Sequence, residues 1–237
     1  MIFKNKQVVV TGGTGALGSA VVARLLESGA TVHIPVFNED ELAHFPHNTH
    51  ERVVMVPNVD LTDEALVQKF YDGVGEVWAS IHIAGGFDMS PVGETTASAF
   101  DAQMARNAKT CFLCSREAVK AMRGHGGSPG VGGRIVNVAA RPGLEPRQGA
   151  GMVAYTASKA AVVAITQAMG EELAADGIWV NAVAPSVLDT PANRAAMADA
   201  DFTVWPKPDE VAATIVHLAS PDNGAARGAV VPVYGKA

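Results

Sequence analysis

Short apolar segments alternate with longer amphipathic ones along the chain, and this alternation predicts an α/β fold. The apolar segments are rich in Val and Ile, as expected for parallel strands that helices cover on both faces. Right-handed crossovers between such strands produce a doubly wound sheet, here of about seven strands flanked by helices. The length of 237 residues is within the range of one large α/β domain, so we expect a single domain over residues 1–237.

The individual elements are expected where the apolar pattern is regular. The expected strands, in chain order, are Gln7–Thr11, Thr31–Val36, Val53–Val56, Val77–Ala84, Arg134–Ala140, Trp179–Ala184 and Ala229–Val233. Leu17, Val21 and Leu25 recur every four residues and predict a first helix, as Leu66 and Phe70 do for a second. Further helices are expected over Thr96–Met122, Val153–Ala175 and Asp209–Ala219.

The composition argues against several classes of protein. The formal net charge is −6 and no long basic run is present, which is not the pattern of a nucleic-acid-binding surface. The N-terminus leads almost directly into the strand Gln7–Thr11, without the apolar stretch and cleavage site of a secretory signal. Since no apolar segment is long enough to span a bilayer, we expect no membrane insertion and a cytoplasmic location.

Three other segments have two interpretations each. Cys111 and Cys114 are either a redox or metal pair or two buried thiols on one helix face, and the second is favoured because no further Cys/His pair completes a metal set. Pro35–His50 contains three regularly spaced histidines, but a solvated loop is favoured over a metal site. The glycine-rich segment Gly124–Gly133 leads into a strand, whereas a phosphate-binding loop opens a helix, so we expect a surface connection.

The residues after the first strand read Thr-Gly-Gly-Thr-Gly-Ala-Leu-Gly and open the first helix, which predicts a dinucleotide site in a Rossmann-type fold. Gly12 allows a tight turn, and Gly13 and Gly15 allow the backbone to approach a pyrophosphate. Gly18 permits close packing of the helix on the sheet. The helix N-terminus offers N–H groups and the positive end of its dipole to the phosphates.

The end of the second strand bears on the choice of dinucleotide. A carboxylate there would bind the ribose hydroxyls of NAD, and a basic residue would accept the additional phosphate of NADP. The chain has neither type over Pro35–Asn38, and no Lys or Arg lies in the glycine turn. We expect NAD as the cofactor, and NADP stays open.

A tyrosine and a lysine lie four residues apart in the segment Tyr155-Thr-Ala-Ser-Lys159. Their spacing puts both side chains on one face of a helix. Together with the glycine turn, this segment resembles the short-chain dehydrogenase/reductase family, and the resemblance covers nearly the whole chain. It implies an NAD(P)-dependent oxidoreductase that transfers hydride between the nicotinamide and a small carbonyl, alcohol or imine-like (dihydropterin-like) substrate.

Other landmarks of the family occur in the expected order. His82–Gly86 resembles its Asn-Asn-Ala-Gly segment, with His82 replacing the first Asn, and Asn107 falls where the family has a catalytic asparagine. Pro185–Thr190 resembles its Pro-Gly-x-x-x-Thr segment, with Ser in place of Gly. The cofactor-binding residues that the resemblance implies are Gly12, Thr14, Gly15, Leu17, Phe37, Asp60, Leu61, Ala84, Gly85, Tyr155, Lys159, Pro185, Leu188 and Thr190.

The chemistry of hydride transfer explains the Tyr/Lys pair. Negative charge develops on the carbonyl oxygen, so a proton must arrive there, and Tyr155 is the proposed general acid/base. A free tyrosine has a pKa of about 10, and the neighbouring ammonium of Lys159 and the positive nicotinamide are expected to lower it. The resemblance implies that Lys159 also holds the ribose and that Asn107 supports a water linking Lys159 to solvent. The alternative is that Tyr155 is only a half-buried aromatic and Lys159 a solvated helix residue.

The family's serine at the end of the fifth strand is replaced, in this alignment, by Ala140. An alanine donates no hydrogen bond, and losing one such donor costs on the order of a hundred- to thousandfold in rate. One alternative is an enzyme that works without the serine, as the related dihydropteridine reductases do, or with another donor such as Arg141, Gln148, His82 or Ser186. The other is a catalytically impaired dinucleotide-binding sensor or scaffold. A working enzyme is favoured because Tyr155, Lys159 and Asn107 are all present.

Two expectations concern the outer surface. Residues 190–206 are expected to form a short substrate lid, in which Met197, Phe202, Val204 and Trp205 either wall an apolar pocket or anchor the lid to the core. The two long helices carry many small apolar residues, and the resemblance implies that they form a four-helix contact between subunits. We therefore expect a homodimer or homotetramer with a small-molecule substrate and no nucleic-acid partner.

Overall fold

The computed structural model describes residues 1–124 and 132–237, and within them seven strands form one sheet. The strands are β1 (Gln7–Thr11), β2 (Thr31–Pro35), β3 (Val53–Val56), β4 (Ala79–His82), β5 (Gly133–Val138), β6 (Ile178–Pro185) and β7 (Val230–Val233). They are ordered β3-β2-β1-β4-β5-β6-β7, and every neighbouring pair is parallel. The order reverses between β1 and β4, as in a doubly wound Rossmann-type sheet. The predicted fold class is confirmed.

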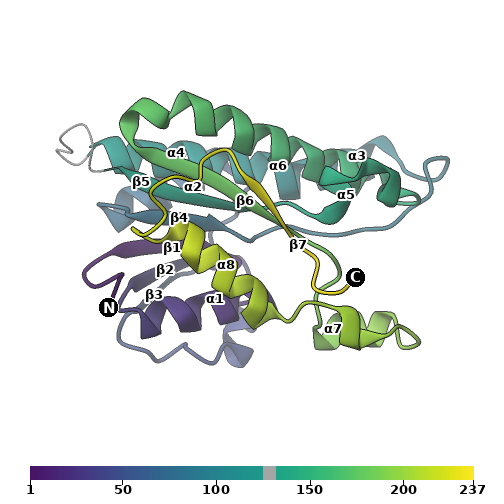
Figure 1. Ribbon diagram of the computed structural model, residues 1–237, viewed down its shortest axis with the longest axis horizontal. Helices are drawn as coiled ribbons and strands as arrows, with labels where there is room; N and C mark the ends of the chain where they lie inside the picture. Colours follow the sequence, from purple (N-terminus) through teal and green to yellow (C-terminus); the bar gives the residue numbers. More distant parts are fainter. Residues whose placement is uncertain (125–131) are drawn as a thin grey trace.

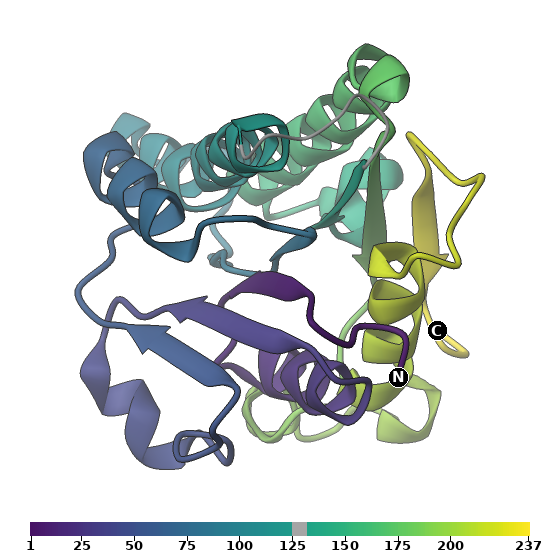
Figure 2. The ribbon, with the colours of Figure 1, turned by 90° about the vertical axis from the view of Figure 1, so that its left-hand side faces the viewer.

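Helices cover both faces of this sheet (Figures 1 and 2). Their bounds are α1 (Ala16–Glu27), α2 (Glu64–Val74), α3 (Ala97–Met104), α4 (Thr110–Gly124), α5 (Arg141–Leu144), α6 (Val153–Glu172), α7 (Pro191–Ala196) and α8 (Pro208–Ala219). In Figure 2, α1 and α8 lie below the sheet and α2, α4 and α6 above it. The core is accordingly divided between the two faces.

Side chains that alternate along each strand fill the two halves of the core. Val8 and Val10 of β1 belong to the apolar cluster under α1 and α8, while Val9 belongs to the cluster under α2 and α4. Successive residues of a strand point to opposite faces, which explains why nearly continuous apolar runs were needed. The rigid sheet holds the ends of its strands in fixed positions relative to one another.

The structure corrects several expected bounds. The expected helix Thr96–Met122 is divided by a π-helical turn, Ala105–Lys109, between α3 and α4. Pro35–His50 is not entirely a loop, because Glu39–His44 forms a 3-10 helix whose N-terminal Asn38 accepts a hydrogen bond from the Asp40 amide. The short helix α5 was not expected at all. Of the glycine-rich segment Gly124–Gly133, residues 125–131 lie outside the described part.

Both cysteines are buried on α4, as predicted. Burial raises the pKa of Cys111 to about 12 and that of Cys114 further, so both are thiols at neutral pH. Within residues 1–124 and 132–237, His, Cys, Asp and Glu side chains form no group of three or more with the geometry of a metal site. No helix in these ranges has the length and apolar character to cross a bilayer.

Candidate active site

The predicted site residues follow the carboxyl ends of β1, β4, β5 and β6. Because all these strands are parallel, their carboxyl ends meet at one edge of the sheet, where ligands of doubly wound folds bind. Figure 1 shows α5 and α7 at this same end of the molecule. The site is therefore assembled from segments that are far apart in the sequence.

The glycine turn after β1 has two kinds of glycine. Gly12 has φ +66°, and a Cβ there would lie 2.8 Å from the backbone nitrogen of Ala84, so the protein itself requires glycine. A Cβ on Gly13 would press against Ile34 at 3.0 Å, so this glycine serves core packing rather than the expected phosphate approach. Gly15 is exposed, and a Cβ there would meet only the Gly12 oxygen at an ordinary 3.5 Å. The space above Gly15 is thus left for something outside the chain.

The start of α1 has an uncompensated positive end. Its N-cap residue is Gly15, no side chain caps the first amides, and the first turn contains no acidic residue. Leu17, 6% exposed, anchors this first turn to the core. A helix start with free N–H groups and an open glycine fits the pyrophosphate of a dinucleotide.

The residues that follow β2 and β3, which were expected to contact the adenosine, lie side by side. Val59 donates its amide to the Val36 carbonyl at 3.0 Å, which holds the two segments together. Phe37 is 68% exposed directly after this contact. Asp60 uses one carboxylate oxygen to accept from the Thr62 amide and hydroxyl, both at 2.8 Å, so Leu61 is held in a tight turn.

An acidic side chain that sequence reasoning missed reaches this region. The Thr14 hydroxyl, in the glycine turn, donates to the carboxylate of Glu41, in the 3-10 helix after β2. Glu39 and Asp40 precede it in the same turn. The residues are 27 positions apart, and only the fold brings them together.

Lys159 and Asn107 meet at Gly85, and the ring of Tyr155 lies near Lys159. The Lys159 Nζ lies 5.9 Å from the centre of the Tyr155 ring and donates to the Val138 carbonyl at 2.8 Å. A Cβ on Gly85 would lie 3.5 Å from the Lys159 Nζ and 2.5 Å from the Asn107 Oδ1. The structure thus brings the predicted catalytic residues together beside the loop that follows β4.

Asn107 lies in the π-helical turn and is 2% exposed. Its Oδ1 accepts from the Gly86 amide at 3.1 Å, and its Nδ2 donates to the Gly86 carbonyl at 2.9 Å and to the Ser158 Oγ at 3.1 Å. These bonds connect the loop after β4 to α6, next to Lys159. The expected water-linked path from Asn107 to Lys159 stays a prediction.

Burial is the main cause of the pKa shifts of Tyr155 and Lys159. It raises the pKa of Tyr155 to about 12 and lowers the pKa of Lys159 to about 8. Burial is the cause of the shift at Tyr155, and the expected lowering of its pKa by Lys159 together with the nicotinamide stays a prediction. At neutral pH Tyr155 holds its proton and Lys159 its charge.

The aromatic ring against Tyr155 was not predicted. The ring of Phe87 meets that of Tyr155 edge to face, with centres 4.9 Å apart and an angle of 89°. Phe87 follows Gly85 and Gly86 directly, but no motif singles it out. Its role depends on a contact made across 68 residues.

The expected lid consists of α7 and a 3-10 turn, Phe202–Val204. Thr190 caps α7 by accepting the Asn193 amide at 3.2 Å, and the Lys236 amide of the C-terminal tail donates to the Val204 carbonyl at 2.9 Å. The rings of Phe202 and Trp205 contact each other at 5.0 Å. The tail thus fastens the segment from its outer side.

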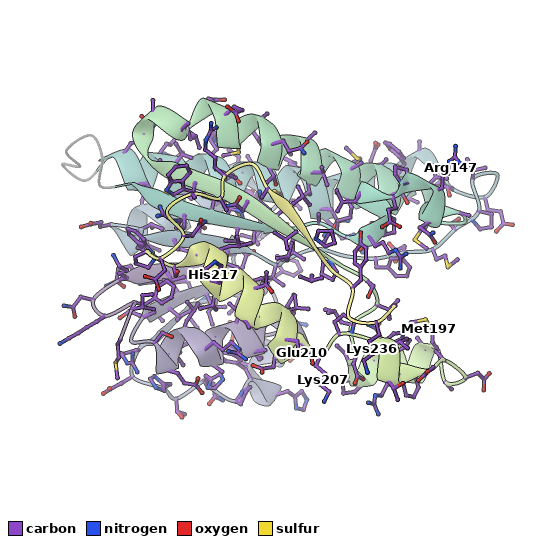
Figure 3. The ribbon with its side chains drawn as sticks, in the orientation of Figure 1. Arg147, Met197, Lys207, Glu210, His217 and Lys236 are labelled. Carbon is purple, nitrogen blue, oxygen red and sulfur yellow. The ribbon has the colours of Figure 1, made fainter. Side chains whose placement is uncertain are left out.

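A cavity of about 900 Å³ lies between this segment, the start of α8 and the C-terminal tail. Figure 3 shows Lys207, Glu210 and Lys236, all of which line it, and Met197 nearby. Phe202, Val204 and Trp205 also line it, whereas the described lining does not include Tyr155. This cavity is separate from the converging catalytic residues.

Comparison with known proteins decides the family. Residues 6–201 match the sequence model of short chain dehydrogenases. The chain is 30% identical to the (2S)-[(R)-hydroxy(phenyl)methyl]succinyl-CoA dehydrogenase subunit BbsD of Thauera aromatica, over 99% of this chain and 97% of that protein. The chain belongs to the short-chain dehydrogenase/reductase family.

Two further comparisons agree with this assignment. The short-chain dehydrogenase is 32% identical to the NAD(+)-dependent 2-dehydro-3-deoxy-L-rhamnonate dehydrogenase of a Sphingomonas strain, over 80% of this chain and 74% of that protein. A short-chain type dehydrogenase/reductase of Mycobacterium ulcerans has the same fold, with a TM-score of 0.88 at 24% identity, over 100% of this chain and 90% of that one. The protein is therefore an NAD(P)-dependent dehydrogenase with a small-molecule substrate.

Ala140, which is predicted to replace the family's serine, lies in an apolar segment directly after β5. Ala139 and Ala140 are 2% and 6% exposed, and Ala140 leads into α5. A Cβ on Gly143 of α5 would lie 2.8 Å from the Lys159 carbonyl, so α5 packs tightly on α6. The segment is fixed in place but presents no hydroxyl.

The suggested substitute donors of the short-chain dehydrogenase are mostly occupied. His82 is 4% exposed, and its ring nitrogens contact the Asn137 Oδ1 and the Ser80 Oγ, both at 2.8 Å, so its ring lies in the core with both nitrogens occupied. The Ser186 hydroxyl donates to the Tyr234 carbonyl at 2.9 Å. Arg141 pairs with Glu145 at 3.0 Å. Gln148 is exposed.

Proposed function

We propose that this dehydrogenase transfers hydride between NAD and a small carbonyl, alcohol or imine-like substrate, with Tyr155 as general acid/base. The observation that carries the proposal is that Lys159, near the Tyr155 ring, meets Asn107 at Gly85, beside a glycine turn with an open helix N-terminus. The bound dinucleotide would supply or accept the hydride, that is, one hydrogen with two electrons, at the substrate carbon.

In the direction of reduction, the Tyr155 phenol donates its proton to the carbonyl oxygen as the carbon gains hydride, so the C=O bond becomes an alcohol. The resulting tyrosinate is stabilised by the Lys159 ammonium and regains its proton from solvent. Lys159 also holds the ribose, and Asn107 keeps the loop after β4 in position. A phenol that keeps its proton at neutral pH suits this donor role.

The proposed cofactor contacts follow the ends of the strands. Gly12, Thr14, Gly15 and Leu17 would form the pyrophosphate site at the start of α1. Phe37, Asp60 and Leu61 would border the adenine. The nicotinamide side would be formed by Ala84, Gly85, Pro185, Leu188 and Thr190. The parallel sheet supports this assignment, because these residues follow neighbouring strands at one edge.

NAD is proposed over NADP because of the charge near the glycine turn. Glu41 contacts Thr14, and Glu39 and Asp40 are close by in the same helix. These carboxylates would repel the additional phosphate of NADP. The Sphingomonas relative, whose name specifies NAD(+), supports the same choice.

Ala140 is proposed to stand where most relatives have serine, so the enzyme works without that hydroxyl. A substrate with an easily reduced carbonyl or imine needs less help from an oxyanion donor. The apolar strand end, with His82 and Ser186 bonded elsewhere, also favours a second candidate, an impaired dinucleotide-binding sensor or scaffold. The intact Tyr155, Lys159 and Asn107 favour the enzyme.

The Tyr155→Phe variant tests the proposal. It removes only the hydroxyl, so we expect turnover of a carbonyl panel to fall by at least about a hundredfold while NADH binds with nearly unchanged affinity. NADH affinity is measured by fluorescence titration and turnover by NADH absorbance. Tight NADH binding by a wild-type protein that turns over no substrate would favour the sensor instead.

The proposal also covers the extent of the domain, the substrate lid and the oligomeric state. We propose a single dinucleotide-binding domain over residues 1–237, with residues 190–206 as its lid. We also propose a homodimer or homotetramer formed through α4 and α6. Phe112 of α4 is 48% exposed, and the outward positions Ala164 and Ala168 of α6 are small, which supports close helix packing between subunits.

A further inference from the structure

Apolar side chains remain exposed on the solvent side of Tyr155. Phe87 packs against the Tyr155 ring at 4.9 Å, yet 55% of its surface is exposed. A large aromatic side chain that contacts a catalytic phenol and still faces solvent has free apolar area next to the reacting position.

Two further side chains extend this surface. The Ser90 amide donates to the Gly151 carbonyl at 2.9 Å, which holds the loop after β4 against the residues that precede α6. Met89 reaches Gly151, where a Cβ would lie 3.1 Å from its Cε, and is 65% exposed. Val153, two residues before Tyr155, is 47% exposed. We name Phe87, Met89 and Val153 the apolar wall.

The charge within the same loop is directed away from the wall. Asp88, between Phe87 and Met89, pairs with Arg106 and accepts from the Gln103 Nε2 at 2.8 Å. Arg106 in turn lies over Gly86, where a Cβ would be 3.1 Å from its guanidinium. The Asp88 carboxylate is therefore neutralised on the side of α3, and the wall itself is formed by hydrocarbon, ring and thioether surface.

We propose that the apolar wall receives the hydrocarbon part of the substrate, so that this dehydrogenase acts on aromatic and cyclic carbonyl compounds rather than on small polyhydroxylated ones. The inference rests on the proposed function, in which Tyr155 delivers the proton. A ring seated on Phe87 would lie next to the ring of Tyr155, the proposed proton donor. A polar substrate would lose water at this surface without gaining hydrogen bonds.

Continuity with Tyr155 favours a small substrate over a protein partner as the occupant. Phe87 contacts the Tyr155 ring directly, and Val153 lies on the same turn of α6. A second subunit covering the wall would also cover Tyr155 and close the site to its substrate. Self-association through this surface is therefore an outcome that the test must detect.

The test compares two substrate classes in one assay. Acetophenone and cyclohexanone are the apolar probes, and acetoin and dihydroxyacetone are the polar ones, each reduced with NADH. We expect the wild-type kcat/KM to favour the apolar pair by about a hundredfold or more. Phe87→Ala should lower kcat/KM for acetophenone about tenfold and leave that for dihydroxyacetone within about threefold. For Phe87→Leu, we expect a kcat/KM for acetophenone between those of the wild type and Phe87→Ala.

Val92→Ala is the matched control. Val92 is 73% exposed in the same loop, so its truncation removes apolar surface without touching the wall. We expect both substrate classes to be unaffected. NADH affinity and sedimentation of every variant verify that the fold and the assembly are intact.

Different results would overturn the inference about the apolar wall and the proposed dehydrogenase function on which it rests. Equal use of polar and apolar probes, or an equal loss for both in Phe87→Ala, overturns the wall as a substrate surface, while loss of turnover in Tyr155→Phe would still support the proposed function. A change of oligomeric state in Phe87→Ala identifies a subunit contact and also overturns the inference. Turnover by Tyr155→Phe at the wild-type rate overturns both.

Discussion

The Lys159 ammonium donates a hydrogen bond of 2.8 Å to the Val138 carbonyl, the last residue of β5. Lys159 is 6% exposed, so this bond satisfies a cation that has lost most of its water. It ties α6 to the sheet at the position where Tyr155 is one helical turn away. The lysine therefore holds the geometry of the proposed site as well as its charge.

Replacing Lys159 by methionine removes its charge and its hydrogen bond to Val138 together and tests their combined contribution. Lys159→Met keeps most of the side-chain volume but removes the charge, so we expect kcat to fall by about a hundredfold or more. Thermal unfolding should change little, because the variant also removes a desolvated cation. Lys109→Met, at an exposed position, is the control and should retain full turnover.

The pH dependence of reduction should follow Lys159. Its pKa of about 8 means that the ammonium is lost as pH rises through that value, whereas Tyr155, with a pKa of about 12, stays protonated. We expect kcat/KM for carbonyl reduction to be constant from pH 6 to about 7.5 and to fall above pH 8. A profile that stays flat to pH 9.5 would contradict this assignment.

His82 should make the protein sensitive to acid. Burial lowers its pKa to about 4, below the unfolded value of 6.5, so the unfolded chain binds more protons between these two pH values. The contribution of neutral His82 to the free energy of unfolding is fully present above pH 6.5. It is lost as the pH falls towards 4, which lowers the free energy of unfolding by on the order of 3 kcal/mol.

His82→Asn removes this titration and should flatten the decline. Urea unfolding at pH 7 and at pH 4.5 measures the difference for both proteins. The comparison uses the change with pH, because the substitution itself disturbs the contacts with Ser80 and Asn137. An equal decline in wild type and variant would assign the acid sensitivity to other groups.

Glu41 should set the preference for NAD. Reversing its charge in Glu41→Arg removes a repulsive carboxylate beside Thr14 and offers a partner to the additional phosphate of NADP. We expect the ratio of NADPH to NADH affinity to rise by about tenfold. Glu51→Arg makes the same charge change at another exposed position, and it should leave the ratio unchanged.

The assembly should depend on the outer face of α6. Ala164→Glu places a charge on a small exposed position of that helix, so we expect the oligomer to dissociate at micromolar concentration. Analytical ultracentrifugation measures the change. Ala65→Glu, on the exposed side of α2, is the control. A wild-type protein that sediments as a monomer would refute the proposed assembly itself.

The local sequence pattern was sufficient to predict the fold class, but it did not predict where the strands end at the carboxyl edge of the sheet. The bounds of β1 and β3 agree residue for residue with expectation, because polar or turn-forming residues flank both runs. The expected β4 and β5 were too long, since Ile83–Ala84 and Ala139–Ala140 are apolar although they leave the sheet. An apolar residue looks the same in sequence whether it extends a strand or borders a site.

The candidate site shows the same limit: residues in local motifs could be predicted, and residues defined by contacts distant in sequence could not. Tyr155, Lys159 and Gly12 could be proposed from the sequence because their expected roles impose a fixed local spacing. Glu41 and Phe87 were missed because their partners, Thr14 and Tyr155, are distant in sequence. The burial that raises the Tyr155 pKa could not be predicted either, because the extent of burial is a property of the packed structure.

The π-helical turn at Ala105–Lys109 makes the helical segment from residue 97 to 124 two pieces that are out of phase. A π turn accommodates one residue more than an α turn, which rotates the remainder of the helix by about 100°. Asn107 lies within this turn, and its side chain faces inward to Gly86. Deleting a single residue there would restore a regular helix and rotate α4 by about 100° relative to α3, so α3 could not keep its packing on α6 while α4 kept its packing on α2.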